Sequence, residues 1–240
     1  MAVSYRGFEE RFRGSYEVTR EQQRGYLSCF AGQALPVVDL GCGRGEMVEL
    51  LTTHGHVAYG VESHPEMLEA ARERGLPVVE ADLLEHLASL PEASLGGVFM
   101  AQVIEHVPRP RVLVLCELLA SRLAPGGKVV IETLNPQCLF AYAPFYMDFT
   151  HRWPVHPLTL EYLLAAHGFA GFETRYQQYV PEDMLRLPQR FAAPDAPQVE
   201  RDLAEALQKL QIIVDLAFRN FIYALVAERP ALPAGSPARP

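Results

Sequence analysis

Short apolar runs alternate along the chain with segments in which apolar residues recur every three or four positions. A run of four to eight apolar, β-branched residues is typical of a strand covered on both faces, and the longer spacing is typical of a helix that buries one face. Five strands are predicted, at residues 37–40, 57–62, 77–82, 95–102 and 128–135. Helices are predicted between them, at residues 45–54, 65–75 and 111–123. This order predicts an α/β protein whose parallel sheet has helices on both faces.

The pattern changes after residue 135. Residues 136–157 combine aromatic residues with prolines and histidines and show no regular period, so we expect a lid or acceptor-binding segment there. Further elements are predicted downstream: a helix at 158–169, a sixth strand at 172–180, a helix at 199–210 or slightly longer, and a last strand at 218–228. We interpret residues 31–230 as one domain with a helical insertion at 181–217, followed by a proline-rich, disordered tail at 231–240.

Three glycines follow the first predicted strand, at positions 41, 43 and 45 in the stretch VVDLGCGRGEMVELL. In an open α/β sheet, ligands bind beyond the carboxyl ends of the strands, where glycine allows tight turns and close approach to the backbone. The dinucleotide fingerprint has the spacing G-x-G-x-x-G, whereas this loop has the tighter spacing G-x-G-x-G. The loop therefore favours a ligand that has no pyrophosphate.

Acidic residues stand at or just after the ends of the first three predicted strands. Asp39 supplies a carboxylate beside the glycine loop, and Glu62 ends the second strand, where an acid binds ribose hydroxyls. Asp82 follows the third strand, where its carboxylate would meet an exocyclic amine. These three positions predict a nucleoside-containing ligand.

Composition and charge narrow the class of protein. The 240 residues carry 21 Lys and Arg against 29 Asp and Glu, a formal net charge of −8. Because broad nucleic-acid and anionic-membrane surfaces need concentrated positive charge, neither is expected. The N-terminal residues do not have the pattern of a signal peptide, no apolar run is long enough to span a bilayer, and the four cysteines lack CxxC spacing. We therefore expect a cytoplasmic protein with reduced thiols, and the pattern specifies no oligomeric state.

Five motifs occur in a fixed order: D-L-G-C-G-R-G, V-E-S, E-A-D-L, A-Q-V-I-E-H-V-P and L-A-P-G-G. Together they resemble the class I methyltransferases that use S-adenosyl-L-methionine, over residues 37–135. The resemblance implies a Rossmann-like, doubly wound sheet of seven strands in the order 3-2-1-4-5-7-6, with the last strand antiparallel. It also implies that S-adenosylmethionine is the cofactor.

The resemblance implies contacts for each part of this cofactor. The methionine part would be held by Asp39, Gly41 and Gly43, and the ribose hydroxyls by Glu62 with Ser63 beside it. The adenine would be contacted by Asp82 and Leu83. The methionine and the sulfonium would be bordered by Ala101, Gln102 and His106.

The flanks, RFRGSYEVTREQQRGYLSCF and MDFTHRWPVHPLTLEYLLAAHGF, are similar to a bacterial subgroup linked to surface-polysaccharide assembly. That subgroup has the patterns F-R-G-S and D-P-T-H-x-x-P-V-H-P-E-T-L. Phe149 replaces the proline of the second pattern, and Leu158 replaces its glutamate. Residues 1–30 would form a helical cap over the cofactor site, with a helix that begins at an N-cap at Thr19.

This cap contains Arg13 and Arg24, and one of them would bind the carboxylate of the cofactor. The alternative is that both are ordinary surface charges. Among the histidines, His151 is the first choice for a catalytic base toward a hydroxyl acceptor, oriented by Asp148. The alternative is that His151 only ties down a loop through hydrogen bonds.

The pair Glu105–His106 has three interpretations: it caps a loop, borders the cofactor, or binds a metal. Related methyltransferases that carry Mg²⁺ have a second glutamate three or four residues earlier, and here Gln102 and Ala101 occupy those positions. Because Mg²⁺ favours carboxylates, no metal is predicted.

Four hypotheses follow. The first is O-methylation of a saccharide or a similar small hydroxylated acceptor. The second is metal-assisted O-methylation of a quinone precursor or an RNA end. The third is a dinucleotide oxidoreductase, which the glycine spacing disfavours, and the fourth is a non-catalytic module that binds S-adenosylmethionine.

Overall fold

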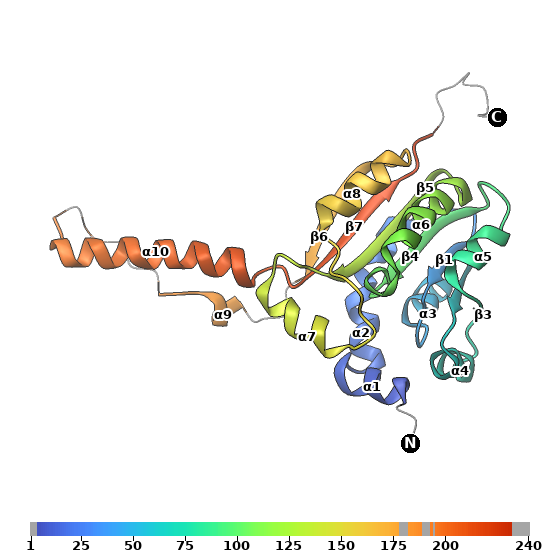
Figure 1. Ribbon diagram of the computed structural model, residues 1–240, viewed down its shortest axis with the longest axis horizontal. Coiled ribbons are helices and arrows are strands. Elements are labelled where there is room, and N and C mark those ends of the chain that lie inside the picture. Colours follow the sequence, from blue (N-terminus) through green and yellow to red (C-terminus); the bar gives the residue numbers. More distant parts are fainter. Residues whose placement is uncertain (1–3, 178–181, 189–192, 194, 232–240) are drawn as a thin grey trace.

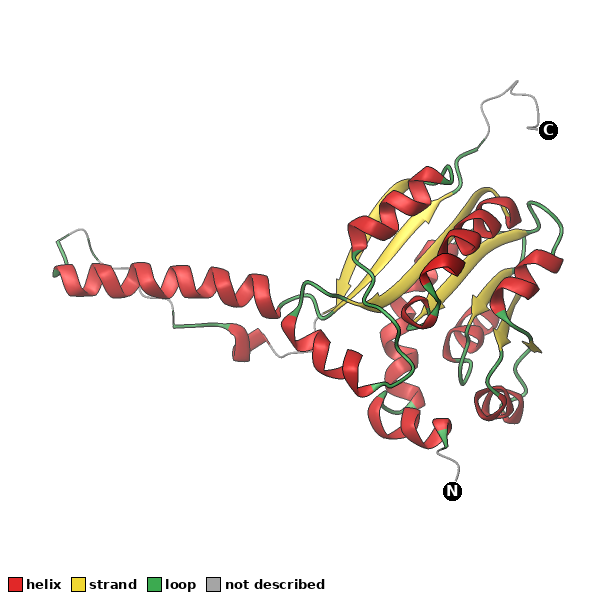
Figure 2. Ribbon diagram, viewed as in Figure 1, coloured by secondary structure: helices red, strands yellow, loops and turns green. Residues whose placement is uncertain are grey.

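The computed structural model describes residues 4–177, 182–188, 193 and 195–231, and Figures 1 and 2 show the arrangement of its elements. The tail predicted to be disordered lies outside the described residues, apart from Ala231. No helix among the described residues is long and apolar enough to cross a membrane.

One seven-stranded sheet forms the centre of the fold, with the strand order β3-β2-β1-β4-β5-β7-β6. The strands are β1 (Val37–Leu40), β2 (Ala58–Glu62), β3 (Val78–Glu80), β4 (Leu95–Ala101), β5 (Leu123–Leu134), β6 (Ala170–Gln177) and β7 (Ile222–Glu228). Strands β1 to β5 pair in parallel, and β7 is antiparallel to both of its neighbours. The predicted strand order and the antiparallel last strand are confirmed.

Helices cover both faces of the sheet because successive strand residues point to opposite faces. Val38 and Leu40 belong to the core on one face, and Val37 belongs to the core on the other. The first core includes residues of α5 (Leu83–Ser89), α6 (Arg109–Arg122) and α8 (Pro157–Ala166). The second includes residues of α3 (Glu46–Thr53) and of the 3₁₀ helix η1 (Arg24–Phe30). Helix α4 (Pro65–Glu73) begins at a proline, as predicted.

The N-terminal segment differs from its prediction. It forms α1 (Tyr5–Phe12), α2 (Tyr16–Gln23) and η1 instead of one helix that starts at Thr19. Helix α2 is capped by Ser15, whose hydroxyl accepts a hydrogen bond from the amide of Val18 at 3.3 Å, so the predicted cap at Thr19 was wrong. Gly14, at φ +96°, allows the turn between α1 and α2 that places Ser15 at the helix start.

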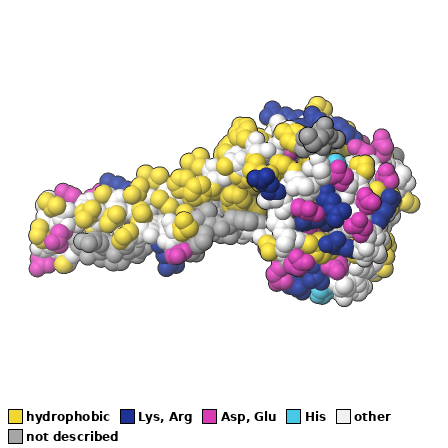
Figure 3. All heavy atoms as spheres, turned by 90° about the horizontal axis from the view of Figure 1, so that it is seen from below, with side chains coloured by type: hydrophobic (Ala, Val, Ile, Leu, Met, Phe, Trp, Pro, Cys, Tyr) yellow, Lys and Arg dark blue, Asp and Glu magenta, His cyan; other side chains and the backbone are white. Residues whose placement is uncertain are grey.

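After β5 the structure contains helices that the sequence patterns did not predict, or predicted as shorter. Residues 136–157 contain the 3₁₀ helix η3 (Leu139–Ala141) and the short helix α7 (Tyr142–Met147). The helix predicted at 199–210 runs as α10 from Gln198 to Phe218 and projects from the body as an arm beside α9 (Glu182–Leu185). Figure 3 shows hydrophobic side chains along this arm. The predicted sixth strand appears as β6, and its last predicted residues, 178–180, lie outside the described residues.

Candidate active site

The glycine loop joins β1 to α3 at the carboxyl edge of the sheet. Gly41, Gly43 and Gly45 have φ values of +71°, +56° and +89°, in the left-handed region that favours glycine. A Cβ atom at Gly41 would overlap the side chain of Val103, so this position also has no room for a side chain. The loop therefore holds its backbone in a conformation that a substitution would strain.

Glu62 ties the glycine loop to the end of β2. One of its carboxylate oxygens accepts a hydrogen bond from the amide of Gly43 at 2.9 Å. The other accepts from the amides of Ser63 and His64 at 2.8 and 2.7 Å. The carboxylate is buried at the edge of a cavity, and each of its oxygens has two lone pairs, so it retains acceptor capacity toward a ligand.

This first cavity, of about 470 Å³, opens at the carboxyl ends of the strands. It collects most of the predicted cofactor contacts: Arg13, Gly41, Gly43, Glu62, Ser63, Asp82, Leu83, Gln102 and His106. These predicted contacts come from five separate segments of the chain and meet around one space. Asp82 also caps α5 and pairs with Arg111 at 2.7 Å.

Three predicted contacts do not line this cavity. Asp39 lies buried behind the glycine loop, and its burial raises its pKa well above the ordinary value. Ala101 is buried, and its carbonyl oxygen accepts a hydrogen bond from Arg13 at 3.3 Å. Arg24 is not brought to the site, because its guanidinium pairs with Glu21 at 2.8 Å on the exposed side of the N-terminal helices.

Arg13 is the arginine that the fold brings to the cavity. Its guanidinium is 3.0 Å from the carboxylate of Glu9, one helical turn earlier, and it also contacts the carbonyl of Ala101 at the end of β4. Glu9 is buried, so the ion pair is shielded from water on one side. This pair fixes a cation next to Gly43, where a ligand carboxylate would reach it.

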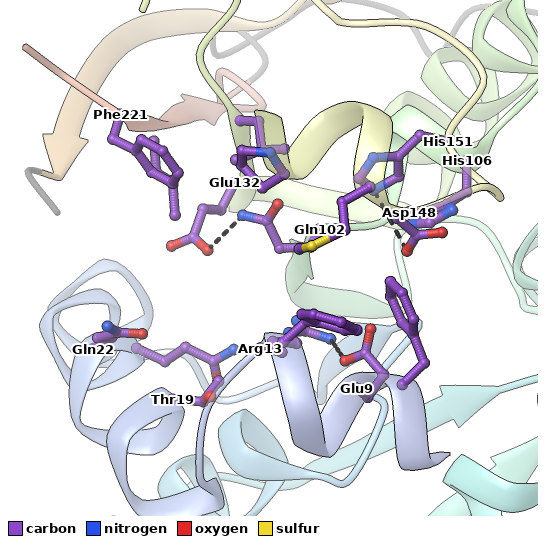
Figure 4. A pocket seen from close by; sticks show the side chains of 17 residues that line it. Glu9, Arg13, Thr19, Gln22, Gln102, His106, Glu132, Asp148, His151 and Phe221 are labelled. Atoms are coloured by element: carbon purple, nitrogen blue, oxygen red, sulfur yellow. Dashed lines mark hydrogen bonds and ion pairs between the residues drawn. The ribbon is translucent and has the colours of Figure 1, made fainter. Parts of the chain in front are cut away.

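A second cavity, of about 260 Å³, adjoins the first and is shown in Figure 4. Both cavities are lined by Glu9, Arg13, Gln102 and His106. The second cavity adds polar and charged groups from distant segments: Thr19, Gln22, Gln23, Glu132, Asp148 and His151. It also has the aromatic rings of Phe8, Phe12 and Phe221.

Glu9 and Glu132 are site residues that the sequence analysis missed. The signal for Glu9 is its i,i+4 spacing to Arg13 on a helix. The signal for Glu132 is a carboxylate inside a strand whose other residues are apolar, since buried acids need partners. Glu132 accepts hydrogen bonds from the Tyr26 hydroxyl at 2.7 Å and from the amides of Gln102 and Gln177 at 3.2 Å each.

Two histidines at the second cavity have their Nδ1 atoms engaged. The Nδ1 atom of His151 is 2.7 Å from the carbonyl oxygen of Phe145. Because a carbonyl oxygen only accepts, this nitrogen carries a proton and a neutral His151 has its lone pair on Nε2. That Nε2 atom lies 3.8 Å from Asp148 and 4.0 Å from Glu105.

The neighbouring imidazole, His106, belongs to a chain of hydrogen bonds. Its Nδ1 atom is 3.0 Å from the Thr150 hydroxyl, which donates to Asp148 at 2.6 Å. Since that hydroxyl has one proton, Nδ1 of His106 is the donor and its Nε2 is unprotonated. Burial, and next the nearby His151, lower the pKa of His106 to about 4, so its ring is neutral near pH 7.

Glu105 lies beneath this histidine pair and is fully buried. Neither carboxyl oxygen has a hydrogen-bond partner among the described residues, and burial raises the pKa of Glu105 to about 7. One ligand atom from each of Glu105, His106 and His151 lies within 4.8 Å of the others. At this spacing the three residues are close enough to share a proton or to ligate one metal ion.

The comparisons with known proteins agree with this site. Residues 16–174 match the family described as a methyltransferase domain, and the chain belongs to that family. A solved S-adenosylmethionine-dependent methyltransferase from Archaeoglobus fulgidus is 33% identical, with a TM-score of 0.83, over 94% of this chain and 100% of that one. The fold and the family define a class I methyltransferase with S-adenosylmethionine as cofactor.

Two further similarities are more distant. The ubiquinone biosynthesis O-methyltransferase of Xanthomonas axonopodis pv. citri is 34% identical over 104 residues, which are 41% of this chain and 43% of that protein. The chain thus spans less than half the length of this relative. Phosphoethanolamine N-methyltransferase 2 of Haemonchus contortus shares the fold, with a TM-score of 0.62 at 19% identity over 95% of this chain and 60% of that one.

Proposed function

We propose that this protein transfers a methyl group from S-adenosylmethionine to a hydroxyl of a small polyhydroxylated acceptor, with saccharides as the leading class. The observation that carries the proposal is the meeting of two cavities at Gln102 and His106. One cavity has the groups that a nucleoside and an amino acid need, and the other has a free imidazole nitrogen. Acceptor and cofactor would meet at the shared wall.

In our proposal the first cavity holds the cofactor. Glu62 and Arg13 both line it: the carboxylate of Glu62 would bind the ribose hydroxyls, and the guanidinium of Arg13 would bind the methionine carboxylate. The proposed cap is formed by α1 and α2. It is held on the domain by the Ser4 hydroxyl, which donates to Glu66 at 2.7 Å, and by Arg20, which pairs with Glu49 at 2.6 Å. Closing this side excludes water from the sulfonium.

S-adenosylmethionine supplies an electrophilic methyl group, so the protein has to align the acceptor and remove its proton. In our proposal Nε2 of His151 takes the proton from the acceptor hydroxyl. Asp148, 3.8 Å from that nitrogen, stabilises the imidazolium that forms. The hydrogen bond from Nδ1 to the carbonyl of Phe145 holds the ring in the tautomer that accepts a proton.

The lining of the second cavity supports a polyhydroxylated acceptor. Carboxylates and amides that bind hydroxyls, among them Glu132, Gln23 and Gln102, alternate with the rings of Phe8 and Phe221, on which the apolar face of a sugar would stack. The flanking patterns similar to the polysaccharide-linked subgroup lie at this cavity: one holds Arg13 and the other Asp148 and His151.

A panel of nucleotide sugars and glycans with methyl-labelled cofactor tests the proposal. We expect transfer to a hydroxyl of at least one member, with a product stable to base, and calorimetry should show binding of S-adenosylmethionine and not of NAD. Methylation of amines alone in a broad panel would contradict O-methylation. Cofactor binding without turnover of any acceptor would favour a non-catalytic module.

A second candidate is metal-assisted O-methylation. It is favoured by the cluster of Glu105, His106 and His151, because both histidines use Nδ1 for an orienting hydrogen bond, as metal-bound histidines do. The partial similarity to the ubiquinone biosynthesis O-methyltransferase supports transfer to oxygen in this candidate as in the first. We expect EDTA to leave the rate unchanged. The cluster offers a single carboxylate, that of Glu105, whereas Mg²⁺ prefers oxygen ligands. A rate abolished by EDTA and restored by Mg²⁺ or Zn²⁺ would establish this candidate instead.

A further inference from the structure

Helix α10 is a 21-residue element, and among the residues that the structure describes none covers its outer face. Its inner side packs on α9: Gln211 donates to the carbonyl of Leu185 at 3.0 Å and accepts from the amide of Leu187 at 2.7 Å. At its root, the ring of Phe218 packs against that of Phe140 in a tilted arrangement, with 4.6 Å between the ring centroids. A helix of this length extends about 30 Å, so its N-terminal tip lies far from the body.

The outer face carries a regular apolar stripe. Its members are spaced alternately by four and three residues: Val199, Leu203, Ala206, Leu210, Ile213 and Ala217. Val199 is 77% exposed and Ile213 58% exposed, although both are large apolar side chains. Figure 3 shows the hydrophobic surface that runs along the arm. A spacing of four and three over this length is the heptad pattern of helices that pair in a coiled coil.

We propose that this stripe is a self-association surface, on which the α10 arms of two copies of the chain pair antiparallel. Residues 198–205 carry three acidic residues and one basic residue, whereas residues 206–219 carry one acidic and two basic residues. Within the helix, Lys209 pairs with Glu205 and Arg219 pairs with Asp215. Antiparallel pairing therefore sets the tip of each arm, with its excess of acidic residues, against the root of the other, with its excess of one basic residue. It also opposes the two helix dipoles, and a two-fold axis uses the same stripe on both copies.

The same charges disfavour a membrane as the occupant. Helices that lie on anionic bilayers are rich in Lys and Arg on their polar face. Between residues 198 and 219, Glu200, Asp202, Glu205 and Asp215 outnumber the basic residues Arg201, Lys209 and Arg219. Since each arm joins its own body at the C-terminal end of α10, antiparallel arms place the two bodies at opposite ends of the pair.

Sedimentation of the full chain tests the surface. We expect a dimer for the wild type, and a monomer for Leu203→Glu combined with Leu210→Glu, with the dissociation constant raised by about 100-fold or more because pairing would bury charges. Ile212→Glu is the matched control: it replaces an exposed apolar residue of the same helix, but on the opposite side from the stripe, and should stay dimeric. Both variants should keep the wild-type cofactor affinity, which shows that the body of the protein is folded in each.

Cross-linking tests the orientation. Val199→Cys alone should not form a disulfide between copies, whereas Val199→Cys with Ala217→Cys should, because antiparallel arms bring the two positions together. A wild-type monomer at micromolar concentration, an unchanged dimer in the Leu203→Glu, Leu210→Glu variant, or cross-linking by Val199→Cys alone overturns the proposal. So does stripe-dependent binding of the wild-type monomer to phosphatidylserine vesicles, which would make the occupant a membrane.

Discussion

The Nδ1 atom of His106 donates a hydrogen bond to the Thr150 hydroxyl over 3.0 Å, and that hydroxyl donates a hydrogen bond to Asp148 over 2.6 Å. Two segments 44 residues apart are thereby joined at the wall between the two cavities. Replacing Thr150 by Val keeps the shape but removes the group that orients the imidazole. We expect kcat to fall about 10- to 100-fold, as for other groups that orient a site residue. Thr150→Ser should retain most of the activity. Equal kcat values for Thr150→Val and Thr150→Ser would show that the hydroxyl does not orient the imidazole.

His151→Ala should lower kcat by about 10²–10⁴-fold, the usual contribution of a general base. Cofactor affinity should change little, because His151 lines the second cavity and not the first. His167→Ala is a matched control: the Nδ1 of His167 also lies 2.7 Å from a carbonyl oxygen, at the end of α8 and away from both cavities. If His151→Ala retains full kcat, the base has to be another group, with His106 next to be tested.

Arg13→Ala should weaken S-adenosylmethionine binding by about 1.5–3 kcal/mol, the range for losing a hydrogen bond to a charged group. Arg24→Ala should leave the affinity unchanged, because Arg24 pairs with Glu21 at the surface. Isothermal calorimetry on the two variants measures both. A loss of affinity confined to Arg24→Ala would mean that the cap closes in a different arrangement when the cofactor binds.

Glu62→Gln should bind S-adenosylmethionine more tightly than Glu62→Ala, because the amide oxygen still accepts hydrogen bonds. Both variants should discriminate less than the wild type against a 2′-deoxyribose analogue of the cofactor. Competition calorimetry gives the ratio of affinities. Full preference for the ribose form in both variants would remove Glu62 from the ribose site and leave it the role of bracing the glycine loop.

Glu105→Gln should change how stability depends on pH. The folded-state pKa of Glu105 is raised to about 7 by burial, so the native protein keeps a proton that the unfolded chain releases at lower pH. The resulting stabilisation is present below the unfolded pKa, about 4.3, and is lost as pH rises through 7. Denaturant unfolding in EDTA at pH 5 and pH 8 should show a fall in unfolding free energy that is smaller in Glu105→Gln, by up to about 3 kcal/mol. If the unfolding free energy falls equally in the wild type and in Glu105→Gln, Glu105 is ionised in the native state.

Periodic patterns predicted the central fold because each strand and helix there buries one face or both, and burial imposes a spacing of two or of three and four. The glycine loop after β1 and the acids Glu62 and Asp82 were predicted to lie near one another, since carboxyl ends of parallel strands share one edge. Helix α7 escaped prediction because its sequence, YAPFYM, is too short and too aromatic to show a period.

The sequence determined which residue types are available to the site. The tertiary structure decided which individual residues of each type come together there. Arg13 and Arg24 are equivalent as residues of one polar segment; only the turn at Gly14 and the ion pair with Glu9 bring Arg13 to the cavity. Glu9 and Glu132 are separated by more than a hundred residues and line one cavity. Local patterns record how each segment is covered, but a contact between distant segments depends on how helices pack over the sheet edge, which no single segment encodes.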